Sequence, residues 1–320
     1  MTAFLIRRLF QTVLLMIAIT ALVFLIINFV PGGPFDELMF GTGQISQSQI
    51  DRLNALIGLD QPWYERYFRW VVNVLQGDWG TSWGVAFGQQ VSDVILDRLD
   101  ATLMLMGWST LLSIVIALPI GIYSAVKQYS WIDYLVTGLS YFGLAMPTFW
   151  FGIALIIIFA VKIPLLPTSG MHTPGMEGDL VDLIRHMILP VSVLAIGSVA
   201  TWSRFMRSAM LEILSQDYLR TARAKGLRQT AVILRHGARN ALIPMITILG
   251  LDIPTLFAGA VTTEYIFSWP GMGQVFFQAV IASDWPVVQA IIVITAFLVV
   301  MSSLLADVLY AVVDPRIRYA

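Results

Sequence analysis

The chain has 320 residues, of which 58% are hydrophobic and only 12% are charged, and its mean hydropathy is +0.78. A soluble domain carries about 25% charged residues, so a chain this poor in charge cannot cover a surface that faces water. The sequence contains no cysteine, which excludes disulfides, zinc–thiolate sites and thiol nucleophiles. The composition therefore predicts an integral membrane protein with lipid as a partner, and we expect no nucleic acid among its partners.

A bilayer core about 30 Å thick requires about 20 apolar residues of helix. Stretches of this kind with few or no charges occupy residues 9–30, 101–126, 134–161, 187–203, 241–263 and 285–306. The fourth has Pro190 near its expected first turn, and the fifth is interrupted by Asp252 and Pro254. The predicted fold class is an all-α integral membrane protein of six transmembrane helices, in which the short linker 127–133 makes the second and third spans an antiparallel hairpin.

The first apolar stretch follows Arg7 and Arg8, as the core of a signal peptide does. It is longer than the 7–15 apolar residues of a signal core, and no small-residue cleavage site follows it. A retained anchor is therefore the prediction. The chain divides into an anchor helix at 1–31, a loop at 32–100 and a five-helix core at 101–320.

Lysine and arginine set the orientation, because loops rich in them stay in the cytoplasm. With a cytoplasmic N-terminus, 13 of the 19 basic residues lie inside and 6 lie outside. Eight of the 13 fall within 204–239, and the first outer loop is long, so its charges weigh less. Both termini are predicted to be cytoplasmic.

The long first outer loop, 32–100, reads as two short helices. One is expected over 50–57 with Gly58 as its stop, and a second begins with Pro62 as its first residue and ends before Gly77. The second helix would lie on the membrane surface or pack on the outer ends of the spans. The alternative is a docking surface for an external partner, and nine acids against four arginines would favour a cationic one.

The inner segment 204–240 is the most informative part of the chain. Asp217 is expected to cap a short helix over 218–225, and Gly226 stands where a left-handed C-cap residue belongs. A second helix over 229–242 continues past Pro244 into the fifth span. A short helix rich in Arg and Ala between two spans can seat in a groove of another protein. The alternative is an ordinary basic loop of a membrane protein.

Several ordered motifs resemble the permeases of the dipeptide and oligopeptide ABC importer family, and the likeness covers nearly the whole chain. It is most similar to the first of the two permeases, the one with the long outer loop. The motifs are DYLRTARAKG at 217–226, LRHGARNALIP at 234–244, PGGP at 31–34, LDQP at 59–62, GDWGTS at 77–82, PTFW at 147–150, LPTSG at 166–170, EYIFSWPGMG at 264–273 and DVLYAVVDPR at 307–316.

The resemblance implies that the helix at 217–226 couples the permease to an ATPase subunit by inserting into a groove. The residues implied in this coupling are Asp217, Tyr218, Arg220, Thr221, Ala222, Arg223, Ala224, Lys225 and Gly226. The general importer pattern begins with Glu-Ala-Ala, for which this chain has Arg-Thr-Ala. Which side chain anchors the contact is therefore open. The two alanines would allow close approach, and the basic residues would reach acidic groups around the groove.

The resemblance also implies partners: a second homologous permease, two ATP-binding subunits, an extracytoplasmic substrate-binding protein and a peptide substrate. The chain has no Gly-x-x-x-x-Gly-Lys-Ser/Thr loop, so ATP and Mg²⁺ are expected on partner subunits and no cofactor is expected here. His172, His186 and His236 are isolated in sequence, which favours loop or capping roles over metal binding. No convergent catalytic pattern occurs, so the chain itself is not expected to be an enzyme.

Asp252 is a candidate functional residue within a predicted span. Inserting a carboxylate at the middle of a span costs about 2.5–3.5 kcal/mol, so its side chain should face protein or a wet cavity. Pro254 loosens the helix beside it. The hypothesis is that Asp252, Pro254 and Pro147 line the translocation path and that Asp252 meets a peptide amino terminus. The alternative for Asp252 is a polar contact with the partner permease. Glu264, near a span end like Asp307, is interpreted as interfacial.

The predicted function is that of a multi-pass permease subunit in the bacterial inner membrane, which moves di- and oligopeptides into the cell within an ATP-driven importer. The same machinery with a nickel complex, glutathione or a modified peptide as cargo is an alternative. A proton-coupled secondary transporter should show paired buried ionisable groups or matching broken helices. A membrane scaffold or receptor would leave the helix at 217–226 unexplained.

Overall fold

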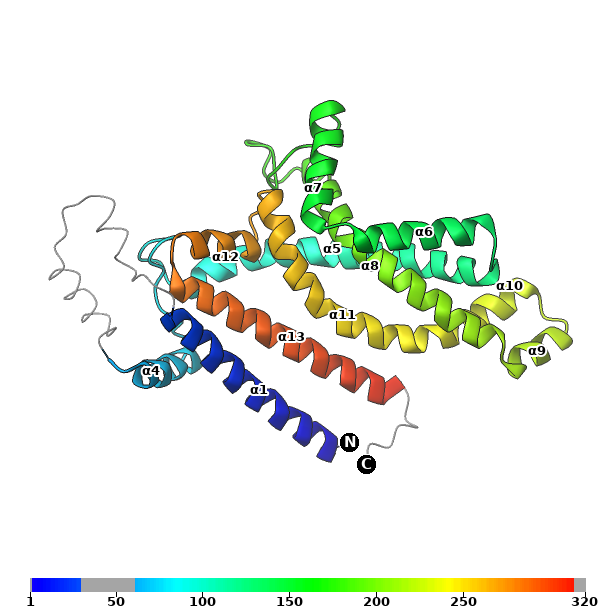
Figure 1. Ribbon diagram of the computed structural model, residues 1–320, viewed down its shortest axis with the longest axis horizontal. Coiled ribbons are helices and arrows are strands. Elements are labelled where there is room, and N and C mark those ends of the chain that lie inside the picture. Colours follow the sequence, from blue (N-terminus) through cyan, green and yellow to red (C-terminus); the bar gives the residue numbers. More distant parts are fainter. Residues whose placement is uncertain (1, 30–60, 314–320) are drawn as a thin grey trace. The chain divides into compact units, whose positions relative to one another are not determined.

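The computed structural model describes the backbone of residues 2–29 and 61–313, with side chains described except at 2–5, 247, 251–259 and 305–313. The predicted loop helix at 50–57 lies outside these residues. The described chain is helical, with one isolated antiparallel bridge between Thr81 and Gln90. It divides into two compact units, Met1–Asp100 with Gly271–Val300 and Ala101–Pro270 with Met301–Ala320. Figure 1 shows its helices in chain order.

Helices cover all six stretches predicted to cross the membrane. They are α1 (Thr2–Phe29), α5 (Val91–Val126), α6 (Trp131–Ala145) with α7 (Thr148–Ile156), α8 (Leu180–Leu214), α11 (Arg239–Ile266) and α13 (Trp285–Val313). Within the described residues, four helices are long and apolar enough to cross a membrane, and the bent pair of α6 with α7 makes up to five. The backbone pairs its own polar groups in such helices, which is why they suit lipid as a solvent.

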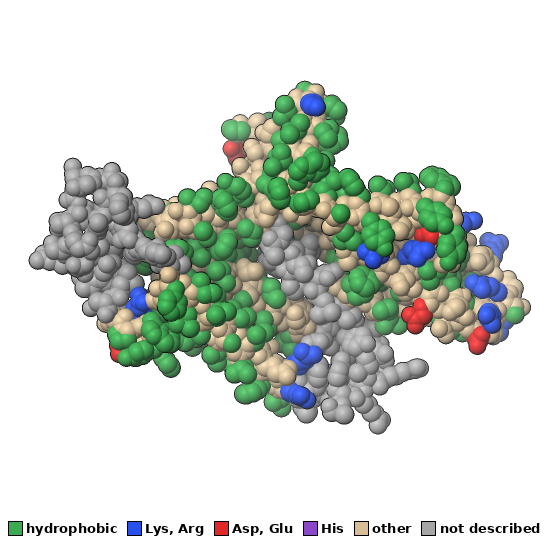
Figure 2. All heavy atoms as spheres, in the orientation of Figure 1, with side chains coloured by type: hydrophobic (Ala, Val, Ile, Leu, Met, Phe, Trp, Pro, Cys, Tyr) green, Lys and Arg blue, Asp and Glu red, His purple; other side chains and the backbone are tan. Residues whose placement is uncertain are grey.

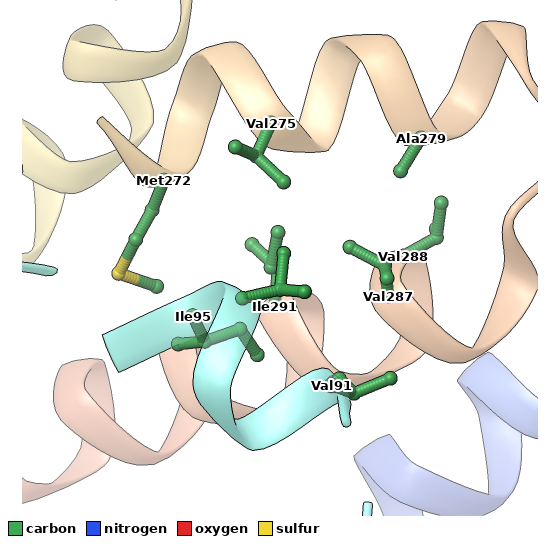
Figure 3. Close-up of a cluster of buried hydrophobic side chains, with 10 residues drawn as sticks. Val91, Ile95, Met272, Val275, Ala279, Val287, Val288 and Ile291 are labelled. Atoms are coloured by element: carbon green, nitrogen blue, oxygen red, sulfur yellow. The ribbon is translucent and has the colours of Figure 1, made fainter. Parts of the chain in front are cut away.

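The first unit has its core where α12 (Met272–Ile281) meets the first turns of α5 and α13. Figure 3 shows Val275 and Ala279 on α12 facing Val287, Val288 and Ile291 on α13. These side chains are all less than 9% exposed. Helix α5 begins at Val91, ten residues before the predicted second span, because Val91 and its neighbours fill this core.

A buried carboxylate closes the turn between α12 and α13 in the same unit. Asp284 is fully buried, and its Oδ2 accepts hydrogen bonds from the hydroxyl of Ser82 and from the backbone N–H groups of Gly84 (2.9 Å) and Val85 (3.0 Å). A Cβ at Gly84 would lie 2.8 Å from the Cβ of Ala282. Only glycine therefore lets the loop approach the carboxylate this closely.

Helix α4 (Trp63–Leu75) is the second helix predicted for the outer loop. Pro62 is the residue before its first turn rather than the first helical residue, and Gly77 has a left-handed φ of 88°. The helix packs on α1, where the hydroxyls of Tyr67 and Thr20 are 3.0 Å apart and the Tyr67 ring meets Phe24 edge-on at 5.5 Å. The structure thus shows the predicted packing of this helix on a span.

The second unit contains the largest departure from the sequence prediction, in the third span. Helices α6 and α7 meet at an angle of 102° around Met146 and Pro147, and a π-helical segment η1 (Ile157–Lys162) extends α7. Proline has no N–H for the preceding turn and forces extended backbone before it. The stretch predicted as the third span, 134–161, is therefore helical but broken at Pro147.

Helix α8 is longer than predicted, because it begins at Leu180 and ends at Leu214. The side chain of Asp179 caps it by accepting a hydrogen bond from the N–H of Val181 at 2.8 Å. Pro190 consequently lies in the interior of the helix and not near its first turn. Helix α8 begins before the apolar stretch 187–203 because its first turns contain the charged residues Asp182 and Arg185.

Helices α5 and α8 approach each other closely at Gly121. A Cβ at this position would lie 2.6 Å from the carbonyl oxygen of Ser203 and 2.7 Å from the Cβ of Met206. Around the contact, Trp202, Met206 and Met210 of α8 are fully buried against Ala117 and Ala125 of α5. Small residues at such a crossing let two membrane helices pack backbone to backbone.

Gly121→Ala should therefore destabilise the folded chain by about 1–3 kcal/mol, since backbone atoms must shift to admit the methyl group. The matched control is Gly107→Ala on the same helix, where an added Cβ meets nothing within 4 Å. We expect it to be neutral or slightly stabilising, since alanine favours helix. Thermal unfolding of both purified variants in one detergent measures the difference, and equal melting temperatures would contradict the close packing.

Candidate coupling surface

The segment after α8 forms the short helix predicted from its sequence. Helix α9 spans Asp217–Ala224, Gln216 precedes it with extended backbone, and Lys225 follows it. Gly226 has a φ of 75°, which confirms the left-handed position predicted for it. Asp217 does not cap the helix but lies in its first turn, 3.4 Å from the guanidinium of Arg220.

One face of α9 is buried against the chain's own helices. Leu219 is fully buried and Ala222 is 8% exposed, and both pack on Val232 with Ile213 and Leu214 at the end of α8. Positions 219 and 222 share a helix face because they are three residues apart. At the side of this contact, the Tyr218 hydroxyl accepts a hydrogen bond of 2.9 Å from the Asn240 side-chain amide.

This burial corrects one expectation about the predicted contact residues. Ala222 was expected to allow close approach of another protein, but its methyl group packs against Val232 of its own chain. Its small size instead lets α9 lie close to Val232. Eight of the nine predicted residues remain exposed on the other sides of the helix and its end: Asp217, Tyr218, Arg220, Thr221, Arg223, Ala224, Lys225 and Gly226.

The exposed part of α9 is strongly basic. Arg220, Arg223, Lys225 and Arg228 are all exposed, and Asp217 is the acid among them. Figure 2 shows Lys and Arg side chains gathered over α9 and α10 (Gln229–Ala231) at this end of the unit. A protruding helix that carries several unburied cations can pair with acidic groups around a groove.

A π-helical segment, η2 (Val232–Ala238), joins α10 to α11 without a break in the helix. Gly237 and Ala238 are buried within it, and a Cβ at Gly237 would lie 3.5 Å from the Met210 side chain. The predicted second helix, 229–242, therefore exists and continues through Pro244 into α11. π-helical segments occur frequently at functional sites, because their extra residue per turn perturbs the regular ladder.

A buried ion pair fixes the helices next to this surface. Arg207 of α8 donates two hydrogen bonds to the Asp133 carboxylate of α6, at 2.7 Å and 2.9 Å. Ser124 of α5 donates to the same carboxylate, as does the N–H of Tyr129 at 2.9 Å. One carboxylate thereby ties α5, α6 and α8 together at the predicted hairpin. The sequence analysis missed the pair, because its members are 74 residues apart.

The structure does not test whether Asp252, Pro254 and Pro147 line a translocation path. Pro147 lies at the bend between α6 and α7, with extended backbone. Positions 252 and 254 lie within α11, so neither ends that helix, but the side chains of Asp252 and Pro254 are outside the described residues. Their part in a path stays a prediction, as does that of Pro147.

Two acidic residues on the predicted outer side have surroundings that the sequence did not reveal. Glu264 was interpreted as interfacial, but it is fully buried and accepts a hydrogen bond of 2.7 Å from Thr102, so that interpretation is wrong. Asp182 accepts two hydrogen bonds of 2.7 Å from Thr173 and lies 3.6 Å from the His186 ring.

Among the described residues, no group of three or more His, Cys, Asp or Glu side chains could hold a metal ion.

The fold defines the class of protein: a helical membrane protein with several apolar helices and the fold of an ABC transporter chain. A chain from a structure of the MetNI methionine ABC transporter in inward-facing conformations matches with a TM-score of 0.58. The match has 17% sequence identity and covers 69% of this chain and 96% of that chain. At this identity it shows the fold alone.

The family follows from the sequence. Residues 117–319 match the binding-protein-dependent transport system inner membrane component family, and residues 1–106 match its N-terminal counterpart. The chain belongs to this family and is therefore a permease subunit of an ABC importer in the bacterial inner membrane. Family members of this kind work with ATPases and a substrate-binding protein.

Relatives that match over the full length are named as permease proteins of peptide transport systems. The oligopeptide transport system permease protein AppB of Bacillus subtilis is 46% identical over 319 residues, which covers 100% of both chains. The dipeptide transport system permease protein DppB of Escherichia coli K12 is 37% identical, and the di/tripeptide permease DppB of Pseudomonas aeruginosa is 39% identical. Each of these two matches covers 100% of this chain and 99% of the relative.

The buried position of Ala222 can be tested against its exposed neighbour. Ala222→Leu should overpack the seat of α9 by about 1–3 kcal/mol and loosen the helix, whereas Ala224→Leu adds the same atoms where there is space. We expect trypsin to cleave the 217–228 segment of the first variant faster than that of wild type, and to cleave the second at the wild-type rate. Equal cleavage of the two variants would show that Ala222 does not face its own chain.

Proposed function

We propose that this permease moves di- and oligopeptides into the cell, pairs with a second homologous permease and is driven through α9 by two ATP-binding subunits. The observation that supports a peptide cargo is the full-length identity of 37–46% to permeases named for oligopeptide, dipeptide and di/tripeptide transport. An extracytoplasmic binding protein delivers the peptide, and ATP and Mg²⁺ bind to the partner subunits and not to this chain.

The proposed topology has six spans with both termini in the cytoplasm, and three parts along the chain: an anchor at 1–31, an outer loop at 32–100 and a permease core at 101–320. Helices at all six predicted stretches support the number of spans. The excess of basic residues on the proposed inner side supports the orientation. The exposed Arg220 and Arg223 of α9, with Lys225 and Arg228 after it, are part of this excess.

The proposed coupling contact uses the exposed part of α9 and leaves Leu219 and Ala222 to hold the helix in place. Arg220, Arg223 and Lys225 are exposed and pair with acidic groups of an ATPase groove, and Ala224 keeps the contact close. Closure of the ATPases on ATP pushes α9 and opens the permease pair to the outside. Hydrolysis returns the cavity to the cytoplasmic side.

The double variant Arg220→Glu and Arg223→Glu tests this contact. Both side chains are exposed, so the chain should fold, while the ATPase subunits should be held about tenfold more weakly, equivalent to about 1.4 kcal/mol. Affinity purification in mild detergent measures the recovered ATPase, and uptake of a labelled tripeptide by cells measures transport. Lys162→Glu is the control, since it reverses an exposed cation on the proposed outer side.

Recovery of a second permease and ATPases with wild type, and loss of ATPase and peptide uptake in the double variant, is the expected outcome. Unchanged ATPase recovery in the double variant would contradict the role of α9. Uptake of a nickel complex or glutathione, without uptake of peptides, would contradict the proposed peptide cargo. A chain that purifies alone and transports in response to a proton gradient would replace the mechanism with that of a secondary carrier.

Asp252 is proposed to line the path and to meet the amino terminus of the peptide. Asp252→Asn should then reduce uptake of a peptide with a free amino terminus and leave uptake of its N-acetylated form unchanged, because only the first presents a cation. Initial uptake rates of the two peptides at equal expression measure this. Unchanged uptake across peptides of different charge would reject the contact and favour a contact with the partner permease.

A further inference from the structure

Helix α4 has a second apolar face that its contact with α1 leaves uncovered. Trp63, Tyr67, Trp70 and Val74 follow one side of the helix, and of these Tyr67 and Trp70 contact α1. Their rings meet Phe24 with centroids 5.5 Å and 6.2 Å away, and the Arg66 guanidinium lies 6.0 Å from the same ring. This side fixes α4 to the span.

The uncovered face is a stripe of four large hydrophobic side chains at helical spacing. Tyr64 (52% exposed), Phe68 (71%), Val72 (47%) and Leu75 (82%) follow one another at intervals of four, four and three residues. Positions three and four apart share a face, so the four side chains form one continuous surface. Single exposed hydrophobic residues are ordinary, but an aligned row of them marks an interaction surface.

A third face of α4 is polar. Glu65, Arg69 and Gln76 are exposed and recur at intervals of four and seven residues beside the apolar stripe. The Arg69 guanidinium donates a hydrogen bond to the Gln61 side chain just before the helix. In Figure 2 the part of the surface formed by α4 is largely hydrophobic, with isolated charged side chains. The helix thus presents one side to α1, one to an apolar medium and one to water.

The contact with α1 places α4 at a definite depth. Thr20 and Phe24 lie nine and five residues before Phe29, the last residue of α1, which is about 14 Å and 8 Å along the axis at 1.5 Å per residue. The apolar part of α1, Ile6–Phe29, is about 36 Å long, slightly more than the hydrocarbon core. With α1 centred in the core, the contact therefore lies about 5–10 Å inside the edge of the hydrocarbon core at the Phe29 end of α1.

We infer that α4 is an interfacial helix, which inserts Tyr64, Phe68, Val72 and Leu75 into the lipid leaflet at the Phe29 end of α1. Amphipathic helices that lie in a membrane surface bury their apolar face about 5–10 Å into this boundary, and Trp and Tyr settle at the same level. The stripe belongs to a helix packed on α1, a predicted span whose own side chains Leu22 and Ile26 are apolar and exposed. Lipid is therefore continuous across both surfaces.

That the leaflet is the outer one rests on the proposed topology. The inferred role differs from that of a docking surface for a soluble protein, which was the other interpretation of this loop. It gives the long loop a fixed attachment to the membrane next to the first span.

The absence of cysteine from the sequence allows a direct test in the assembled transporter. Phe68→Cys and Arg69→Cys place a single thiol on the apolar stripe and on the polar face, one residue apart. Each is labelled with bimane in the purified complex and reconstituted into vesicles of phosphatidylethanolamine and phosphatidylglycerol. Lipid carrying a nitroxide at carbon 5 of its acyl chain then serves as the quencher.

We expect bimane at position 68 to be blue-shifted and quenched by the nitroxide lipid, and bimane at position 69 to be neither. Quenching of neither site would overturn the inference, and a blue shift at 68 without lipid quenching would show that protein covers the stripe instead. The leaflet is tested separately, by labelling Arg69→Cys in intact spheroplasts with an impermeant maleimide. Labelling only after permeabilisation would reject the proposed topology while leaving the lipid contact intact.

Discussion

The seating of α9 on its own chain is the contact on which the proposed coupling depends. An isolated helix of eight residues is unstable in water, because the first turn costs more than its few hydrogen bonds return. Here Leu219 and Ala222 are buried against Val232, so the helix is held by packing rather than by its own propensity. A force applied to its exposed basic side is therefore delivered to α8 and η2 and is not lost in bending a loose loop.

The Asp133 carboxylate joins α8, on which α9 packs, to two further helices. It receives two hydrogen bonds from Arg207 and further ones from Ser124 and the backbone of Tyr129, which join three helices. Removing one partner of such a buried pair costs about 3–5 kcal/mol, since the other charge is left without compensation. The close approach at Gly121 stiffens the same bundle from within. Helices α5, α6 and α8 are consequently held together by polar as well as apolar contacts.

The sequence was sufficient for features that depend on local chemistry. Six apolar stretches correspond to helices, and Gly226 has its left-handed conformation because no other residue adopts it at so little cost. The family follows from motifs spread over the whole chain. The ends of helices were less predictable: α5 and α8 begin before their apolar stretches, since tertiary packing and the Asp179 cap support the extra turns.

Features that depend on residues far apart in the chain could not be predicted. Nothing local distinguishes Ala222, which is buried, from Ala224, which is exposed, because the distinction is made by Val232. Glu264 is buried because Thr102, on another helix, supplies a donor at 2.7 Å. The 102° bend at Pro147 was signalled by the proline, but long membrane helices tolerate proline, as Pro119 in α5 and Pro190 in α8 show.

The continuity of the helix that follows α9 suggests how coupling reaches the membrane interior. From Gln229 to Ile266 the chain is helical without interruption through α10, η2 and α11, and position 252 lies on this path. α9 contacts it at Val232, six residues after Gly226. Because a π-helical segment perturbs the regular hydrogen-bond ladder, η2 is the part of this path that can change its winding most easily. A displacement of α9 would then be transmitted through η2 to α11.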